Sequence, residues 1–339
     1  MPFSTSALLY ISRQILIYGG LFLIFIGMFG SLMLIFIFSQ RPLSRNPCSI
    51  YIVTNAILAF LFLPLFFLPN IVTFGFQINW LAINTPFCKF QMSYGIFTVT
   101  AVFIINCLIS FDRYAISSRS ARIRSISTKK TSICLVIAGV TCAFCLIALP
   151  AAILFENVPI GPNLPAVCTS KSTMFLLVAA FVYYPVLEGV LPIVLAVYFW
   201  FITRRHVRNL QNLEFATRFD KQITRMLLYQ IIVSAIASFP FAAINLYRSL
   251  TVQVVRTADQ ENIVQFIRVM SIWLFYIQYC TDFYIYMKTS SEVRVQFWKI
   301  MCLWCRYRNN RVVPIATRTI TTRKTFQNNN TNRPTPLKY

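Results

Sequence analysis

Residues 88–114, CKFQMSYGIFTVTAVFIINCLISFDRY, decide the fold of this chain. Between Lys89 and the triplet Asp112-Arg113-Tyr114, residues 90–111 carry no charge. At about 1.5 Å per residue this uncharged run forms a helix of roughly 33 Å, which is enough to cross a hydrocarbon core of about 30 Å. The sequence therefore predicts a membrane-crossing helix with Cys88 at one end and the charged triplet at the other.

The composition of the whole chain is that of an integral membrane protein. Hydrophobic residues make up 57% of the 339 residues, and charged residues only 12%. A soluble domain carries about twice that charged fraction. The net charge of +22 would suggest a nucleic-acid partner in a soluble protein. Here the basic residues gather in alternate breaks between apolar stretches, so we expect contact with the lipid bilayer and no nucleic acid.

Seven apolar stretches predict an all-α bundle of seven transmembrane helices. Several contain prolines, including Pro150, Pro192 and Pro240. We expect these to kink the helices without ending them, because neighbouring helices satisfy the freed carbonyls. The predicted spans are Ile15–Phe38, Ser49–Phe67, Cys88–Phe111, Ser132–Phe155, Met174–Thr203, Arg225–Tyr247 and Ile263–Met287.

The distribution of basic residues predicts the orientation of the bundle. One set of breaks and the tail hold most arginines and lysines, whereas the other side holds only Arg13, Lys89, Lys171, Arg248, Arg256 and Arg268. We therefore expect the N-terminus outside and the tail inside, in the plasma membrane. The predicted parts are a short extracellular N-terminus (1–14), the seven-transmembrane domain (15–287), an amphipathic juxtamembrane helix (288–305) and a disordered basic cytoplasmic tail (306–339).

The juxtamembrane segment after the last span has the pattern of a short eighth helix. Phe297 and Trp298 are expected in the membrane interface, while Arg294 and Lys299 meet anionic headgroups. Cys302 and Cys305 follow as candidate palmitoylation sites. Simple interfacial packing is the alternative role for both cysteines.

Cys88 has a candidate partner in Cys168, which lies between the fourth and fifth spans on the same predicted side of the membrane. Both thiols would face an oxidising compartment, where disulfides persist. We hypothesise a disulfide that pins this loop over the third helix. Two unrelated loop thiols are the alternative.

Over roughly residues 15–305 the chain resembles the rhodopsin-like (class A) family of G-protein-coupled receptors, as a divergent member. Cys88, Cys168, the Asp112-Arg113-Tyr114 triplet, Pro192 and Pro240 fall where that family places its loop disulfide, its Asp-Arg-Tyr motif and its fifth- and sixth-helix prolines. The resemblance implies a receptor, and not an enzyme, that binds an extracellular ligand and activates a heterotrimeric G protein. It implies no cofactor.

The resemblance also implies a switch at the inner membrane edge. In the resting state Arg113 would pair with Asp112 and with Asp220 at the start of the sixth helix, and outward movement of that helix would free the arginine. The seventh helix departs from the family. Asp282 and Tyr286 stand at the ends of its Asn-Pro-x-x-Tyr motif, but the proline is missing. The usual polar network of the family must therefore be rebuilt, and Asp282 is expected to supply one carboxylate.

The ligand is constrained by two positions. Amine receptors keep an aspartate where this chain has Gly95, and opsins keep their lysine where it has Tyr276, which argues against both classes. The remaining polar and aromatic candidates favour a short neuropeptide whose carboxylate meets an arginine, although each residue alone could serve helix packing. The pocket candidates are Gln91, Tyr94, Gly95, Glu188, Asn245, Arg248, Arg268, Trp273 and Tyr276.

Other function classes fit less well. A membrane metalloenzyme needs several histidines or paired acids, and the chain has one histidine, His206, so no metal site is expected. A transporter would show an internal repeat and buried charges. A seven-span transporter or channel stays a more distant alternative. Among receptors, a chemosensory receptor for a small molecule is the alternative to the neuropeptide receptor.

Overall fold

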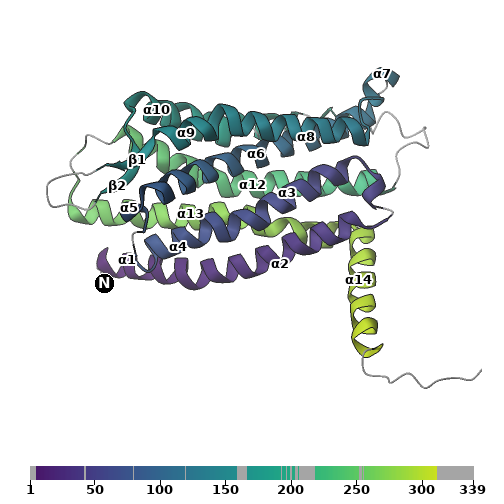
Figure 1. The fold of residues 1–339 in the computed structure, drawn as a ribbon, viewed down its shortest axis with the longest axis horizontal. Coiled ribbons are helices and arrows are strands. Elements are labelled where there is room, and N and C mark those ends of the chain that lie inside the picture. Colours follow the sequence, from purple (N-terminus) through teal and green to yellow (C-terminus); the bar gives the residue numbers. More distant parts are fainter. Residues whose placement is uncertain are drawn as a thin grey trace, which may run out of the picture. The chain divides into compact units, whose positions relative to one another are not determined.

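Long helices make up most of the part of the chain that the structure describes (Figure 1). This computed structural model describes residues 5–41, 43–78, 80–118, 120–158, 166–191, 193–195, 197–198, 201–202, 205, 218–251, 254 and 256–310. The chain divides into two units, Met1–Trp298 and Lys299–Tyr339, and each is treated by itself.

Six helical segments are long and apolar enough to cross a membrane within the described residues. They are Ala7–Ser39 (α1, Thr5–Gln14; η1, Ile15–Gly19; α2, Gly20–Ser39), Cys48–Phe74 (α3, Cys48–Phe62; η3, Leu63–Phe67; α4, Leu68–Phe74), Thr85–Ile116 (α6, Thr85–Ser117), Lys129–Leu154 (α8, Lys129–Ala143; η4, Phe144–Ala148; α9, Leu149–Leu154), Arg225–Leu250 (α12, Arg218–Leu250) and Ala258–Thr289 (α13, Ala258–Thr289).

The remaining predicted span, Met174–Thr203, is helical wherever the structure describes it. It comprises α10 (Thr173–Val178) and η5 (Ala179–Val190), and the described residues from 191 to 202 are helical too. The shorter elements are η2 (Leu43–Arg45), α5 (Trp80–Ile83), α7 (Ala121–Arg124), the strands β1 (Phe155–Val158) and β2 (Val167–Ser170), and α14 (Ser291–Asn310), whose residues from Lys299 belong to the second unit.

Several helices begin or end beyond the predicted limits. The first begins at Thr5 and not at Ile15, because α1 packs against α13 and buries Ser12, so that Arg13 does not interrupt the helix. The third begins at Thr85, where the side chain of Asn84 accepts a hydrogen bond from the Phe87 backbone N–H at 3.2 Å. A side-chain acceptor at this position replaces a helical partner that the first turn lacks.

Prolines lie inside the helical segments, several next to π-helical turns. Pro150 follows η4 in the first turn of α9, and Pro185 lies within η5. The helix α12 is continuous through Pro240, whereas Pro192 lies outside the described residues. A proline ring has no N–H to donate and crowds the carbonyl four residues earlier, and a wider π turn relieves that crowding.

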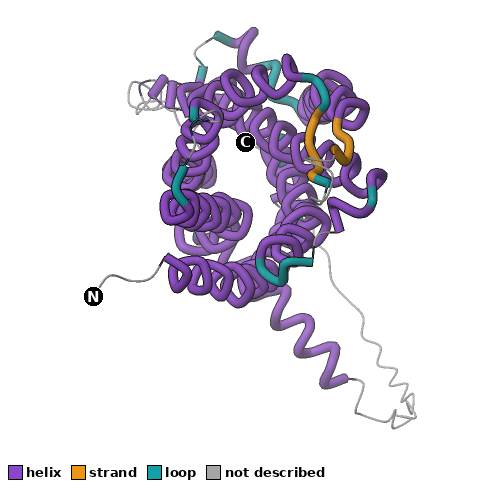
Figure 2. The backbone as a smooth tube through the Cα atoms, turned by 90° about the vertical axis from the view of Figure 1, so that its left-hand side faces the viewer, coloured by secondary structure: helices purple, strands orange, loops and turns teal. Residues whose placement is uncertain are grey.

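Helices far apart in the sequence lie side by side in the first unit (Figures 1 and 2). The helix α13 packs against α12 and α2, and α3 packs against α2 and α6. Aromatic rings fill the contact between α3, η3 and α13. Tyr276 stacks on Phe67 with ring centroids 3.6 Å apart, and Phe62 lies 4.7 Å from Tyr279. These rings belong to one buried core cluster that joins the first, second, third and seventh spans.

Gly95 allows α6 to approach the second span closely. A Cβ atom at this position would lie 2.2 Å from Cε2 and 2.5 Å from Cζ of Phe66. Phe66 itself stacks on Phe62 at 5.0 Å, so its ring has little room to move. The absence of a side chain at Gly95 is therefore a packing requirement.

We expect Gly95→Ala to destabilise the protein by about 1–3 kcal/mol, the usual cost of overpacking a filled core. Thermal unfolding of the purified protein in detergent measures the change. Gly139→Ala is the matched control, because a Cβ there meets a single atom within 3 Å, Cγ2 of Ile104. Equal melting temperatures for the two variants would contradict the packing role of Gly95.

Candidate functional site

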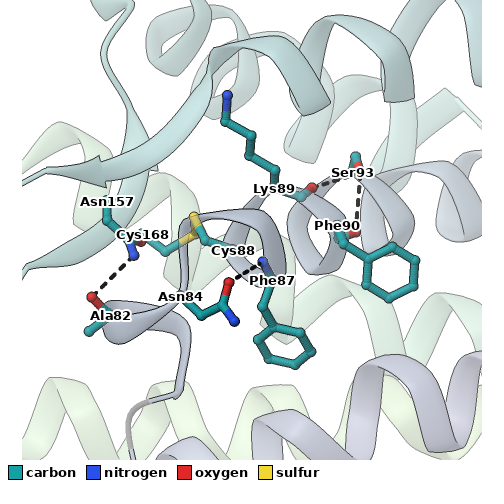
Figure 3. The surroundings of a disulfide bond; sticks show 9 residues. All are labelled: Ala82, Asn84, Phe87, Cys88, Lys89, Phe90, Ser93, Asn157 and Cys168. Carbon is teal, nitrogen blue, oxygen red and sulfur yellow. Dashed lines mark hydrogen bonds between the residues drawn. A yellow bond between two sulfur atoms is a disulfide. The ribbon is translucent and has the colours of Figure 1, made fainter.

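At one end of α6 a disulfide joins Cys88 to Cys168 on β2, with the two Cα atoms 5.7 Å apart (Figure 3). The strands β1 and β2 form an antiparallel hairpin in which Asn157 pairs with Cys168. The amide of Asn157 donates a hydrogen bond to the Ala82 carbonyl at 3.1 Å. The predicted disulfide is therefore present, and it ties the hairpin to the start of α6.

Apolar packing supports the attachment of this hairpin. Leu81, Cys88, Ala151 and Phe155 form a buried cluster under it. Phe155 also makes an edge contact with Phe175 of α10, with ring centroids 5.8 Å apart. The hairpin thus links α5, α6, α9 and α10 at one end of the bundle.

A solvent-facing ion pair joins the residue after β2 to β1. Lys171 pairs with Glu156 of β1, and the hydrogen bond from the ammonium group lowers the pKa of the Glu156 carboxyl below its usual value. The lowered pKa extends the charged state of this carboxylate to lower pH. Because both groups face solvent, the pair adds little to stability.

At the opposite end of α6 the triplet makes a buried ion pair. Arg113 and Asp112 are only 4% and 3% exposed, and Nη2 of the arginine lies 2.7 Å from Oδ2 of the aspartate. The same nitrogen donates to Oδ1 of Asn46 at 3.2 Å. The hydroxyl of Ser127, before α8, donates to the other carboxylate oxygen of Asp112 at 2.6 Å. Neither partner outside the triplet was anticipated from the sequence.

Two other residues, Tyr114 and Asp220, were predicted to belong to the switch at this end of α6. Tyr114 is half-buried and its ring lies 6.2 Å from that of Phe111. Asp220 is in the first turn of α12, but its side chain is outside the described residues. The Asp112–Arg113 contact is observed, whereas the contact between Arg113 and Asp220 stays a prediction.

Between the two ends, five polar side chains from four helices form a central polar cluster: Asn55 of α3, Asn106 of α6, Gln230 of α12, and Asp282 and Tyr286 of α13. The amide nitrogen of Gln230 donates to Asp282 at 3.0 Å and to Asn106 at 3.5 Å. Its amide oxygen accepts from the Tyr286 hydroxyl at 3.0 Å. Asn55 donates to Asn106 at 3.3 Å. Gln230 is therefore the residue that joins α12 to both α6 and α13.

The sequence singled out Asp282 and Tyr286 but missed the three amides of this cluster. The sequence did contain a signal, because Asn55, Asn106 and Gln230 are each a polar residue inside a different apolar span. Polar groups in a membrane span are expensive unless they find partners. They mark helix contacts, although their partners could not be assigned before the helices were placed.

Three of the predicted pocket residues lie in helix contacts. Gln91 is fully buried, with its amide 3.5 Å from the Phe66 carbonyl. Gly95 faces Phe66, and Tyr276 is stacked on Phe67 while its hydroxyl accepts from Asn70 at 3.1 Å. The structure thus uses these three residues to hold the second, third and seventh spans together.

The remaining pocket candidates lie on α6, α12, α13 and η5. Tyr94 stacks on Phe90 with centroids 5.5 Å apart, and the guanidinium of Arg268 lies 5.3 Å from the ring centre of Phe74. Arg248 is half-buried near the end of α12. Asn245 donates to the Phe241 carbonyl of its own helix at 2.8 Å, and Trp273 packs against Gly19 of the first span. The side chain of Glu188, in η5, is outside the described residues.

The two candidate palmitoylation sites lie on α14. Cys302 is exposed within the second unit, and the side chain of Cys305 is outside the described residues. Earlier in the same helix Phe297 contacts Phe283 of α13, with centroids 5.8 Å apart, and Val293 is fully buried. The first turns of α14 therefore pack against the bundle.

We expect Cys168→Ser to lower the free energy of unfolding by about 2–4 kcal/mol, because the bond closes a long loop, with a sequence separation of 80. Thermal unfolding with and without reductant measures it, and reduced wild type should approach the variant. Cys142→Ser, which removes an exposed free thiol, is the control. A Cys168→Ser protein as stable as that control would refute a structural role for the bond.

We expect Gln230→Leu to destabilise the protein by about 1–3 kcal/mol, since it leaves Asp282, Asn106 and Tyr286 without a partner they now share. Ser234→Ala, one turn away, removes a single hydrogen bond to Gln278 and should cost less. Melting temperatures in detergent compare the two. A Gln230→Leu variant that melts at or above wild type would show that the cluster does not hold the helices.

Comparison with known proteins agrees with this geometry. The family model described as 7 transmembrane receptor (rhodopsin family) matches residues 30–286. Somatostatin receptor type 4 of Rattus norvegicus is 24% identical over 288 residues, which cover 83% of this chain and 71% of that protein. The matched residues include both ends of α6 and the central polar cluster. The chain belongs to the rhodopsin family of seven-transmembrane receptors, whose members are receptors and not enzymes.

Proposed function

We propose that this chain is a plasma-membrane receptor, with its N-terminus outside, that binds a short peptide and activates a heterotrimeric G protein through Arg113. The observation that carries the proposal is the buried Asp112–Arg113 pair at the end of α6 opposite the Cys88–Cys168 disulfide. An oxidised cysteine pair belongs on the outer side of a membrane. The arginine at the other end then lies at the inner edge, where a G protein can reach it.

In the proposed resting state the Arg113 side chain is bound to other residues of the receptor and does not face a G protein. Its guanidinium contacts the Asp112 carboxylate and the Asn46 amide, and it is 4% exposed. An arginine keeps its charge at any physiological pH, so it must exchange these partners for others when it turns toward a G protein. A two-state equilibrium follows, in which ligand binding favours the state with new partners for Arg113.

Movement of α12 is the proposed route between the two states. Asp220, in its first turn, would pair with Arg113 at rest, and Gln230 binds α12 to α6 and α13 further along. Displacement of the inner end of α12 would break both sets of contacts. Asp282 and Tyr286 would then take part in the switch through their bonds to Gln230.

A peptide ligand is supported by the relative and by the outer arginines. The relative is named as a receptor for somatostatin, a peptide. In this chain Arg268 and Arg248 lie toward the ends of α13 and α12 that the proposed orientation places outside. Guanidinium groups bind carboxylates with two parallel hydrogen bonds. An acidic side chain or a free C-terminus of the peptide would meet one of them.

The proposal for α14 is an amphipathic eighth helix at the inner membrane surface. Arg294 donates to the carbonyls of Met287 and Lys288 at 3.0 Å and so caps the end of α13. Trp298 is exposed, as expected for a residue in the membrane interface. Palmitoylation of Cys302 and Cys305 would add an anchor.

G-protein activation in cells that express the chain, screened with pooled short peptides, tests this function. We expect a peptide response in wild type that falls at least about tenfold in Arg113→Ala, because the buried cation has no substitute. Arg45→Ala is the matched control, since Arg45 is exposed in η2 near Asn46. Asp220→Ala should raise basal activation if Asp220 holds Arg113 at rest. Surface expression is measured for every variant.

A peptide response that survives unchanged in Arg113→Ala at equal surface expression would contradict signalling through this residue. If peptides fail and small volatile or soluble molecules produce a response that requires Arg113, the receptor is chemosensory and the peptide part of the proposal is wrong.

A further inference from the structure

Ser127 connects the loop between α6 and α8 to the ion pair of the triplet. Its hydroxyl donates to Oδ1 of Asp112 at 2.6 Å, while Oδ2 of the same carboxylate holds Arg113. The loop itself is built from local hydrogen bonds, among them Ser127 N–H to the Arg124 carbonyl at 3.3 Å. The side chain of one loop serine therefore reaches a carboxylate that is 3% exposed.

The same loop carries a dense set of cations beside this serine. Arg122 and Arg124 lie five and three residues before Ser127, and Lys129 and Lys130 follow it. Both arginines and both lysines are exposed, and Ser127 is half-buried. Some serine kinases select their substrates by charge: an acidic groove of the kinase binds basic side chains that precede the serine to be phosphorylated. The pattern around Ser127 has that chemistry.

We propose that Ser127 is a phosphorylation site, and that its modification detaches this loop from Asp112. The inference rests on the proposed function only in placing the loop on the cytoplasmic side, where kinases act. In the reaction Oγ of Ser127 attacks the γ-phosphorus of a nucleoside triphosphate. The bond to the β–γ bridging oxygen breaks, the nucleoside diphosphate leaves, and the hydroxyl proton passes to the base of the kinase.

The phosphoester cannot keep the contact that the hydroxyl makes. Oγ no longer carries a proton, so it cannot donate to Asp112. The phosphate also brings a charge of about −1.5 to −2 next to a carboxylate, which repels it. The exposed arginines and lysines of the loop draw the phosphate outward instead. Asp112 then loses one of the two groups that hold its carboxylate in place, and the resting pair with Arg113 is weakened.

Release of the loop from Asp112 and phosphorylation of Ser127 are thermodynamically linked. If phosphorylation requires the loop to leave Asp112, then any change that releases the loop must speed phosphorylation. Ser125 offers an internal reference, because it is exposed in the same loop and its hydroxyl donates to the Arg122 carbonyl at 2.8 Å and not to the triplet.

The experiment incubates the full-length receptor in lipid nanodiscs with ATP and the catalytic domain of a serine kinase that prefers arginines before the acceptor. Mass spectrometry that resolves Ser125, Ser127 and Thr128 follows the rate at each residue. We expect phosphate on Ser127 in wild type, with an initial rate about tenfold higher in Asp112→Ala, which lacks the acceptor of the hydrogen bond. The rate at Ser125 should not change. Arg122→Ala with Arg124→Ala should remove the signal at Ser127.

Hydrogen–deuterium exchange of residues 120–128, before and after phosphorylation of wild type, gives a second measurement that needs no Asp112 variant. Exchange should rise in the phosphorylated protein. In cells, Ser127→Glu should raise basal G-protein activation at least about twofold, and Ser125→Glu should leave it unchanged.

Phosphate confined to Ser125 or Thr128 in both wild type and Asp112→Ala would overturn the site. Phosphate on Ser127 with unchanged loop exchange would overturn its detachment from Asp112. The kinase and exchange assays use neither ligand nor G protein. A receptor that is phosphorylated on Ser127 with increased loop exchange but never activates a G protein would therefore contradict the proposed function, while the site and its detachment from Asp112 would stand.

Discussion

The need to pair a permanent charge beneath the surface of the bundle governs the Asp112–Arg113 end of this receptor. Arg113 is 4% exposed and cannot lose its proton, so its surroundings must supply acceptors. Two acceptors are Asp112, on the same helix, and Asn46, in the connection between the first two spans. Ser127, in the loop before the fourth span, donates to the other carboxylate oxygen of Asp112. The Asp112–Arg113 ion pair thus joins three segments, and a change in its partners affects all of them.

The same requirement explains the central polar cluster. An amide or carboxyl group inside a membrane bundle needs a partner on another helix. Gln230 meets that need in both directions, since it donates to Asp282 and Asn106 and accepts from Tyr286. Here the seventh helix has an aspartate and no proline before its tyrosine, and the polar connection passes through a glutamine of α12. Its hydrogen bonds, and not a proline kink, couple α12 to α13 at this depth.

The fold could be predicted well from the sequence, and the site in part. Uncharged runs bounded by charge predicted the spans, because hydrocarbon tolerates few other patterns. The Cys88–Cys168 bond was also predicted, since both cysteines fall on the same predicted side of the membrane, and it is present. Gly95, Gln91 and Tyr276 stay predicted pocket residues, and in the structure each also lies in a helix contact, the alternative role that the sequence left open. Sequence position indicates the depth of a residue in the membrane and does not indicate whether it faces a neighbouring helix or the ligand side.

By itself the sequence determined that the chain crosses the membrane repeatedly, which cysteines meet, and that Asp112 and Arg113 share the end of one helix. The spans and the Asp112–Arg113 position follow from hydropathy and from the spacing of residues along a single helix, whereas the cysteine pairing was a hypothesis from the predicted side of the membrane. Only the tertiary structure decided that Ser127 and Asn46 complete that pair, and that Asn55, Asn106 and Gln230 join Asp282 and Tyr286. Such contacts join residues far apart in the chain, and their partners depend on how each helix is rotated about its axis, which the packing of the whole bundle sets.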